Sequence, residues 1–153
     1  MVDRVERIDR ARREIACRCL VPDASPIFEG HFPKYPLLPG TLMIETIAQT
    51  AGYLLLDMLQ YDRMPVLIRV DRAKIRDMVP PGSSLLAEGR IVHEGSGFAV
   101  AEGKILRDGR PVAEAEIRYR TMPFPNAPLR DEFIGQAVKV GLGPAAALRP
   151  AAG

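Results

Sequence analysis

The sequence predicts an α+β domain in which one antiparallel β-sheet wraps around a single apolar α-helix. A run of 20 residues, TLMIETIAQTAGYLLLDMLQ (41–60), contains no proline and is apolar on almost every side, which is typical of a helix enclosed by other structure. Several other segments alternate apolar and polar residues, as half-buried strands do. They do not alternate regularly with helices, as the strands of parallel sheets require. One sheet around one helix is therefore the economical arrangement.

Two strands are expected first, at residues 2–9 (VDRVERID) and 13–20 (REIACRCL), joined by a turn near residues 10–12. The long helix should end near Tyr61 and Asp62. Residues 64–71 (MPVLIRVD) resume a strand pattern, and the following AKIRDMVPPGSS has the Pro-Pro-Gly punctuation of an exposed connection.

Three longer alternating segments complete the sheet, at residues 84–94, 97–107 and 111–121. The turn signals Gly95-Ser96-Gly97 and Asp108-Gly109 separate them, so we expect a three-strand antiparallel meander. The alternating pattern stops after Thr121. We therefore expect a domain over residues 1–121 and a Pro/Ala-rich C-terminal extension over residues 122–153, with a short helix followed by a flexible end.

Length and composition fit one globular domain with a tail. The chain has 153 residues, of which 47% are hydrophobic and 26% charged, and its net charge of +2 is too small to indicate a nucleic-acid partner. The N-terminal MVDRVERIDRARRE lacks the apolar core of a signal peptide, so the sequence predicts a cytoplasmic protein. Charged and amide residues interrupt the long helix, which favours a buried helix over a membrane span.

The candidate chemistry lies where a proline-rich loop enters the long helix. Pro33, Pro36 and Pro39 recur every third residue and should make this loop stiff. His31 precedes them as a group able to exchange a proton near neutral pH, and Glu45 lies inside the apolar helix, where desolvation would favour its protonated form.

Two further groups could support these candidates. Gln49 lies one helical turn after Glu45 and could fix its carboxyl group by a hydrogen bond. The unpaired backbone N–H groups of Gly40 and Thr41 at the helix start could polarise a carbonyl oxygen. Together the groups are suited to removing a proton next to a carbonyl.

Structural interpretations compete with these chemical ones. A histidine in a Gly-His-Phe turn is often structural, although Glu45 is one residue too far from Thr41 to close a capping box with it. His93 falls on the outward phase of its strand. Cys17 and Cys19 would share one strand face, and without a second pair nearby they are expected to be free thiols rather than metal ligands.

The segment GHFPKYPLLPGTLMIETIAQ (30–49) resembles the signature of the FabZ-type 3-hydroxyacyl-[acyl-carrier-protein] dehydratases, HFPGxPxxPGxxxxExxxQ. The agreement is in register and includes the fourteen-residue spacing from His31 to Glu45. Weaker similarity extends over roughly residues 2–121, notably in VDRV and VDRAKIRDMVPPGS. Lys34 replaces the usual glycine, which would reshape the entrance of the site more than its chemistry.

The resemblance implies a hotdog fold and a homodimer whose two sheets join edge to edge, with a trimer of dimers as a larger assembly. Each active site would combine His31 of one subunit with Glu45 of the other. His31 would act at the α-carbon, Glu45 at the departing β-hydroxyl, and Gly40 would donate its N–H to the thioester carbonyl. Gln49 would orient Glu45. The implied substrate is a 3-hydroxyacyl chain on the phosphopantetheine arm of acyl carrier protein, and the reaction needs no metal or other cofactor.

Features outside the motif indicate how substrate and carrier could bind. Gly52 and Leu56 continue the Glu45 face of the helix and could line an acyl tunnel, although helix packing explains Gly52 equally well. An acidic carrier could be steered by five cations: Lys34, Arg69, Arg72, Lys74 and Arg76. A solvated strand edge would explain the same residues equally well. The segment RYRTMPFPNAPL resembles dehydratases that act on very long acyl chains of lipid A.

Two other functions remain open from the sequence. On the same fold, a thioesterase would use Glu45 to activate water against the thioester carbonyl. An acyl-carrier or acyl-chain binding module would keep the fold without catalysis, but it would need neither His31 nor Glu45.

Overall fold

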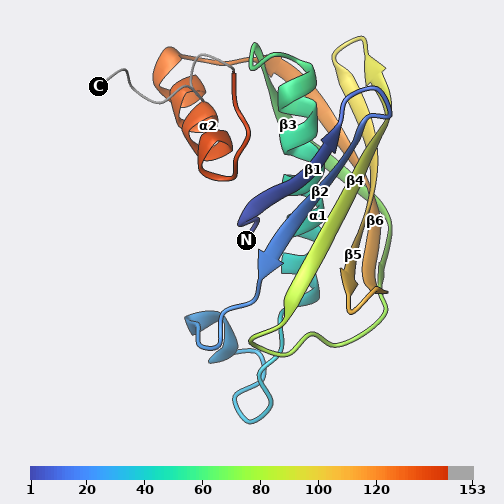
Figure 1. Ribbon diagram of the computed structural model, residues 1–153, viewed down its shortest axis with the longest axis vertical. Helices are drawn as coiled ribbons and strands as arrows, with labels where there is room; N and C mark the ends of the chain where they lie inside the picture. The colour runs from blue at the N-terminus through green and yellow to red at the C-terminus, as the bar shows by residue number, and fades with distance from the viewer. Residues whose placement is uncertain (145–153) are drawn as a thin grey trace.

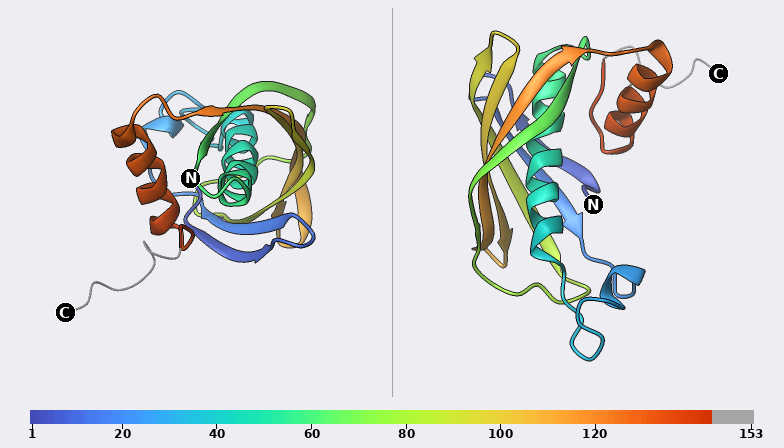
Figure 2. Two further views of the ribbon diagram at one scale, coloured as in Figure 1. Left: turned by 90° about the horizontal axis from the view of Figure 1, so that it is seen from above. Right: turned by 180° about the vertical axis from the view of Figure 1, so that it is seen from behind.

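The computed structural model describes residues 1–144 and contains one six-stranded antiparallel sheet that curls around a helix (Figure 1). The strand order is β1-β2-β4-β5-β6-β3, and every neighbouring pair is antiparallel. Seen from above, the sheet encloses the long helix α1 on one side, and a second helix, α2, lies on the other (Figure 2). The predicted α+β architecture is confirmed.

The strands agree closely with the alternating segments of the sequence. The predicted pairing of the first two strands and the predicted meander of β4, β5 and β6 are both confirmed. The elements are β1 (Arg4–Asp9), β2 (Glu14–Leu20), the short 3₁₀ helix η1 (Pro26–Phe28), α1 (Gly40–Met58), β3 (Arg63–Ile75), β4 (Ser84–Gly95), β5 (Phe98–Arg107), β6 (Arg110–Pro123) and α2 (Ala127–Lys139).

The ends of two elements differ from those that the sequence predicts, because of the structure that the folded chain adopts there. β3 continues to Ile75, four residues beyond the expected end, because it pairs along β6 with an irregularity between Asp71 and Lys74. Helix α1 ends at Met58 rather than near Tyr61, since Gln60 and Tyr61 take positive φ angles of 53° and 60° that a helix does not allow. Local pattern alone indicated neither irregularity.

Small residues on the inner face of the sheet let it approach α1 closely. A Cβ atom added at Gly103 of β5 would overlap the Ile47 side chain, and one added at Gly89 of β4 would lie 3.3 Å from the Ala51 Cβ. Inward residues such as Ile105 and Ile117 are fully buried against the helix. Close packing thus fixes the position of α1, and with it the direction of the side chains on its outer face.

The C-terminal extension is partly described. β6 runs to Pro123, and α2 follows with its N-terminus capped by the Asn126 side chain, which accepts a hydrogen bond of 2.9 Å from the Leu129 N–H. After α2, the Val140 carbonyl accepts a hydrogen bond of 2.7 Å from the Val5 N–H of the edge strand β1. The expected flexible end falls largely on residues 145–153, which lie outside the described residues. Within residues 1–144, no helix is long and apolar enough to cross a membrane.

Candidate functional site

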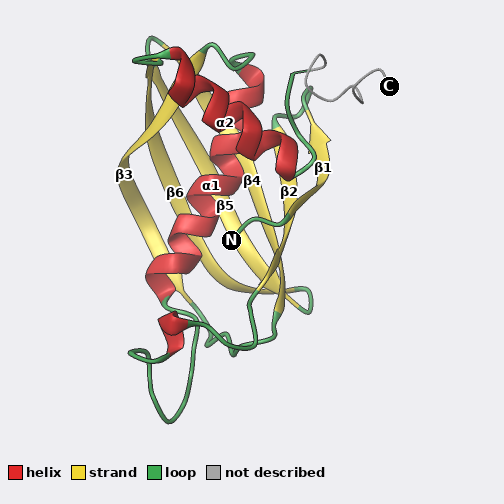
Figure 3. Cartoon of the chain, turned by 90° about the vertical axis from the view of Figure 1, so that its left-hand side faces the viewer, coloured by secondary structure: helices red, strands yellow, loops and turns green. Residues whose placement is uncertain are grey.

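His31 lies in the loop between η1 and α1, which projects beyond the end of the sheet (Figures 1 and 3). Its N–H donates to the Phe28 carbonyl at 3.3 Å, and its own carbonyl accepts the Leu37 N–H at 3.1 Å. Phe28 and Leu37 are buried, so the loop is anchored on both sides of the histidine. The His31 side chain itself is half-buried, and its ring lies 4.6 Å from that of Phe32, centroid to centroid.

Glu45 and Gln49 lie on the outer face of α1, one turn apart. The Gln49 amide nitrogen donates to Glu45 Oε1 at 3.4 Å, as the spacing predicts. Glu45 is exposed in the single chain, so the desolvation expected from its apolar neighbours in the sequence is absent here. The apolar side chains around it in sequence, such as Met43 and Ile47, point toward the sheet and leave the carboxylate outside.

The start of α1 offers free backbone donors. Pro39 caps the helix with its carbonyl, which accepts the N–H groups of Leu42 at 3.0 Å and Met43 at 3.3 Å. Within residues 1–144, the N–H groups of Gly40 and Thr41 have no hydrogen-bond acceptor. A Cβ at position 40 would lie 3.0 Å from Ile75 Cγ1, so glycine permits the close approach of β3 to this end of the helix. These donors carry the positive end of the helix dipole.

The structure brings Glu45, Gln49 and the start of α1 together on one helix, but it does not join His31 to them. Among residues 1–144 no hydrogen bond or ion pair links His31 to Glu45. The histidine belongs to a loop that extends away from its own sheet (Figure 1). A single chain therefore presents two separate parts of the predicted constellation.

Gly52 and Leu56 continue the face of α1 that begins with Glu45. At Gly52 the nearest atoms to an added Cβ are those of the Tyr119 side chain at 3.9 Å, an ordinary van der Waals distance, so the position is not crowded. The Tyr119 hydroxyl itself donates to the Ala48 carbonyl at 2.5 Å. Leu56 is only 2% exposed, because residues of the C-terminal extension cover it. The sequence did not predict this cover.

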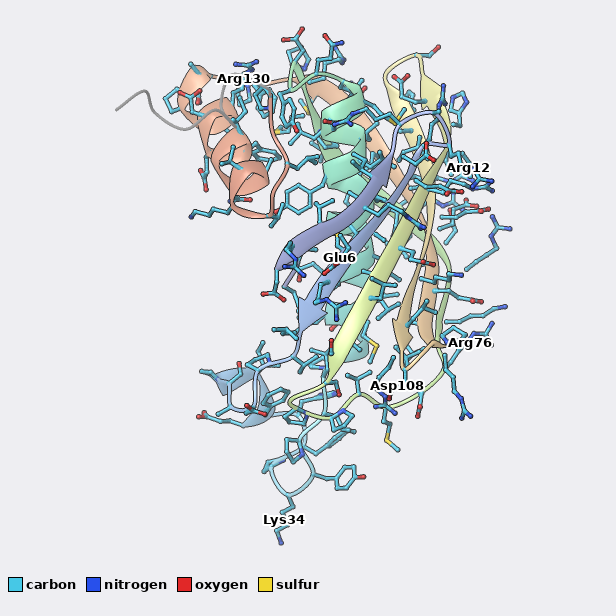
Figure 4. The ribbon with its side chains drawn as sticks, in the orientation of Figure 1. Glu6, Arg12, Lys34, Arg76, Asp108 and Arg130 are labelled. Atoms are coloured by element: carbon cyan, nitrogen blue, oxygen red, sulfur yellow. The ribbon has the colours of Figure 1, made fainter. Side chains whose placement is uncertain are left out.

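The five cations considered for carrier docking are not equivalent. Lys34 extends from the tip of the loop, away from Arg76 beside the sheet (Figure 4). The other four make ion pairs with carboxylates of the same chain: Arg69 with Asp71 at 2.8 Å, Arg72 with Glu116, and Lys74 and Arg76 with Glu114 at 3.7 and 2.6 Å. Arg76 in turn lowers the pKa of Glu114 by its hydrogen bond. Intramolecular pairing leaves less positive charge for a partner than the sequence indicates.

A hollow of about 570 Å³ lies on the outer face of the sheet, but its chemistry does not suit an acyl chain. Ion pairs cross it, among them Arg90 with Glu102 at 3.4 Å and Lys104 with Glu88 at 3.3 Å. Neither His31 nor Glu45 lines it. We therefore place the candidate site at the start of α1 and not in this hollow.

Strand β3 has an apolar edge that the sequence patterns do not predict. This strand ends the sheet, so one side of its backbone has no partner strand within residues 1–144. Large apolar side chains on it are exposed: Leu67 by 46%, Ile68 by 51%, Val70 by 36% and Ile75 by 48%. In the sequence, this edge corresponds to the unbroken apolar run at residues 66–68, where the alternation of apolar and polar residues fails. An exposed apolar edge strand of this kind is a surface for pairing with another chain.

The remaining candidates have structural roles. Cys17 and Cys19 are free thiols on one face of β2, as predicted. Both are fully buried in the core, and burial raises the pKa of Cys17 to about 12 and that of Cys19 to about 11. His93 is exposed on β4, as its outward phase predicts.

Comparison with known proteins gives a consistent match over most of the chain. A family described as FabA-like domain matches residues 1–116. The 3-hydroxyacyl-[acyl-carrier-protein] dehydratase FabZ of Clostridium acetobutylicum is 37% identical over 120 residues, which span 78% of this chain and 84% of that protein. The FabZ of Thermotoga petrophila is 39% identical over 94 residues, or 61% of this chain and 67% of that protein.

Solved structures share the fold at low sequence identity. A Streptococcus mutans protein bound to acetyl-CoA superposes with a TM-score of 0.62 at 15% identity, covering 80% of this chain and 90% of the other. A chain of the dehydratase heterocomplex ApeI:P from Xenorhabdus doucetiae gives a TM-score of 0.61 at 21% identity, covering 78% and 99%. These likenesses confirm the expected hotdog fold.

Proposed function

Because the chain belongs to the FabA-like domain family and is a relative of the FabZ dehydratases, we propose that it converts a 3-hydroxyacyl thioester into the trans-2-enoyl thioester. The substrate is an acyl chain carried by acyl carrier protein, and the reaction serves fatty-acid synthesis. One observation in the structure supports this assignment most directly: an exposed Glu45, paired with Gln49, lies on the helix whose first two N–H groups are free.

The proposed reaction removes one water between the α- and β-carbons. His31 takes the proton of the α-carbon, and the electron pair of that C–H bond forms the double bond as the β-carbon–oxygen bond breaks. Glu45 gives its proton to the departing hydroxyl group, which leaves as water. The Gly40 N–H, with Thr41 beside it, donates to the thioester oxygen where negative charge develops.

We further propose that each site is shared between two subunits. The His31 loop projects from its own sheet, and no hydrogen bond or ion pair within residues 1–144 joins His31 to Glu45. Pairing of two β3 edges would cover the exposed apolar residues Leu67, Ile68 and Val70 and continue the sheet across a two-fold axis. This arrangement would bring the loop of one subunit to the helix of the other. A trimer of such dimers and a cytoplasmic location are part of the same proposal.

Carrier docking and chain class are finer proposals. Lys34 makes no ion pair among the described residues and lies at the tip of the loop, so it is available for an acidic carrier (Figure 4). The four cations paired within the chain would contribute less. A role in making lipid A acyl chains stays a prediction from the sequence.

The test is a mass-spectrometric assay with purified 3-hydroxyacyl carrier proteins, in which loss of one water is measured. We expect His31→Ala and Glu45→Ala each to lower turnover by about 10²- to 10⁴-fold while the variants stay folded. His93→Ala, at the second histidine, is the matched control and should retain full activity. Near-normal turnover by both site variants would refute the assignment. Release of free thiol from saturated acyl thioesters would instead identify a thioesterase.

A further inference from the structure

One face of α1 changes from open to covered along its length. Glu45, Gln49, Gly52 and Leu56 follow each other at intervals of four, three and four residues, so they form a single stripe. Glu45 is exposed, Gln49 and Gly52 are partly exposed, and Leu56 is buried. From Glu45 to Leu56 the stripe is about 16 Å long, at 1.5 Å per helical residue. An apolar chain that starts at the site can follow this stripe only as far as Leu56.

The cover at the end of the stripe comes from the C-terminal extension. Leu56 belongs to a small hydrophobic cluster with Tyr61, Ala137, Val140 and Leu142, and partly buried residues, including Phe124, Phe133 and Ile134, pack against it. Figure 3 shows α2 lying across the C-terminal half of α1 and leaving the N-terminal half uncovered. The helix therefore lies at one end of the stripe, and the candidate catalytic groups lie at the other.

Anchors at both ends hold α2 in this position. Near its start, the Arg130 guanidinium donates to the Tyr61 carbonyl at 2.7 Å. After its end, the Val140 carbonyl accepts the Val5 N–H at 2.7 Å, which ties the extension to β1. The rings of Phe124 and Phe133 pack edge to face with centroids 5.4 Å apart. These contacts make α2 a fixed wall.

We infer that α2 closes the far end of the acyl path and limits the length of the chain that the site accepts. The inference rests on the proposed function, because that function places the thioester at the start of α1. An acyl chain leaving the Glu45 region passes Gly52, where an added Cβ would lie 3.9 Å from the Tyr119 side chain, and then meets the apolar cluster under α2. Phe133 is the largest side chain that α2 contributes to this wall.

The experiment measures kcat/KM for 3-hydroxyacyl carrier proteins of graded chain length. Phe133→Ala should raise kcat/KM for chains longer than the wild-type optimum by about tenfold, the effect of added room in an apolar pocket. Phe133→Leu keeps most of the packing and replaces the alanine variant if that variant does not fold. It should shift the profile in the same direction by a smaller amount. Gly52→Leu places a side chain on the path before α2 and should shift the optimum to shorter chains.

Glu132→Ala is the control, because Glu132 is the exposed neighbour of Phe133 on α2, and it should keep the wild-type profile. If the wild type dehydrates its substrates but the folded Phe133 variants keep its length profile, the role of α2 is refuted while the dehydratase assignment stands. If the wild type dehydrates no 3-hydroxyacyl thioester of any length, the proposed function fails, and the role of α2 fails with it.

Discussion

The Gln49 side chain donates a hydrogen bond of 3.4 Å to Glu45 Oε1 on the exposed face of α1. A carboxyl group held by one neighbour has fewer rotamers available than a free one, so Gln49 should position Glu45 for proton transfer. We expect Gln49→Met, which keeps the length of the side chain but removes the donor, to lower kcat by about tenfold with little change in KM. Steady-state kinetics on a 3-hydroxyacyl carrier protein measures this split.

Gln136→Met is the matched control for this change. Gln136 is exposed on α2, and it makes no side-chain hydrogen bond within residues 1–144. Its replacement should leave both constants at their wild-type values. A Gln49→Met protein with wild-type kcat would show that Glu45 needs no support from Gln49.

Two glycines should respond to alanine in opposite directions. At Gly103 an added Cβ overlaps Ile47 and lies 3.0 Å from the Glu88 carbonyl oxygen, so Gly103→Ala should lower the free energy of unfolding by about 1–3 kcal/mol. At Gly135 in α2 nothing lies within 4 Å of an added Cβ. Gly135→Ala should therefore raise stability by about 0.5–1 kcal/mol through helix propensity. Urea denaturation of both variants measures the two changes. If Gly103→Ala were as stable as Gly135→Ala, the close approach of β5 to α1 would tolerate a side chain.

Subunit sharing predicts recovery of activity when two inactive variants are mixed. If each site takes His31 from one subunit and Glu45 from the other, a hybrid of His31→Ala and Glu45→Ala chains contains one intact site. Random exchange of subunits should then restore about a quarter of wild-type activity, since about half of the dimers are hybrids with one site of two intact. The assay follows dehydration after the two proteins are unfolded and refolded together.

Sites built within one chain would give no recovery, because every site would still lack one group. An independent check uses Ile68→Lys on the exposed edge of β3, where a charge should oppose strand pairing. Light scattering should then report a smaller particle, and activity should fall with it.

The sequence predicted most of the fold because local signals and tertiary structure agree there. Each local pattern forms, in the folded chain, the element that it predicts. The alternating segments are strands, the residues near Gly95 and Gly109 are turns, and the apolar run is α1. The end of β3 could not be predicted in this way. Its last residues pair with β6, and that pairing overrides the loop-like composition of AKIRDMVPPGSS.

The candidate site was predictable in part for a similar reason. Glu45, Gln49 and the start of α1 lie on one helix, so their spacing determines their geometry. Within residues 1–144 no hydrogen bond or ion pair relates His31 to Glu45, and in the proposed dimer that relation would depend on a second chain. The cover over Leu56 depends on a helix more than seventy residues later in the chain. Neither of these two relations can be predicted from the spacing of residues in the sequence. The intramolecular ion pairs of Arg72 and Arg76 likewise follow from strand register, which brings Glu114 and Glu116 beside them.

The buried thiols of Cys17 and Cys19 predict a loss of stability at alkaline pH. Burial raises the pKa of these thiols to about 12 and about 11, from 9.0 for an exposed thiol. Between these values the unfolded chain has released the two protons while the folded chain retains them. The unfolded state then binds fewer protons, so the free energy of unfolding falls as the pH rises above about 9.

The cysteine contribution can be separated by comparing the wild type with Cys17→Ala/Cys19→Ala, using urea denaturation under reducing conditions at pH about 8 and about 10.5. At the higher pH the thiols should account for a loss of about 2 kcal/mol each, since one pKa unit corresponds to about 1.4 kcal/mol. Burial also raises the pKa of Tyr53, Tyr61 and Tyr119, but these residues are present in both proteins. The variant should therefore lose less stability than the wild type between the two pH values. Equal losses would mean that the thiols do not control the alkaline transition and that the tyrosines or other titrating side chains do.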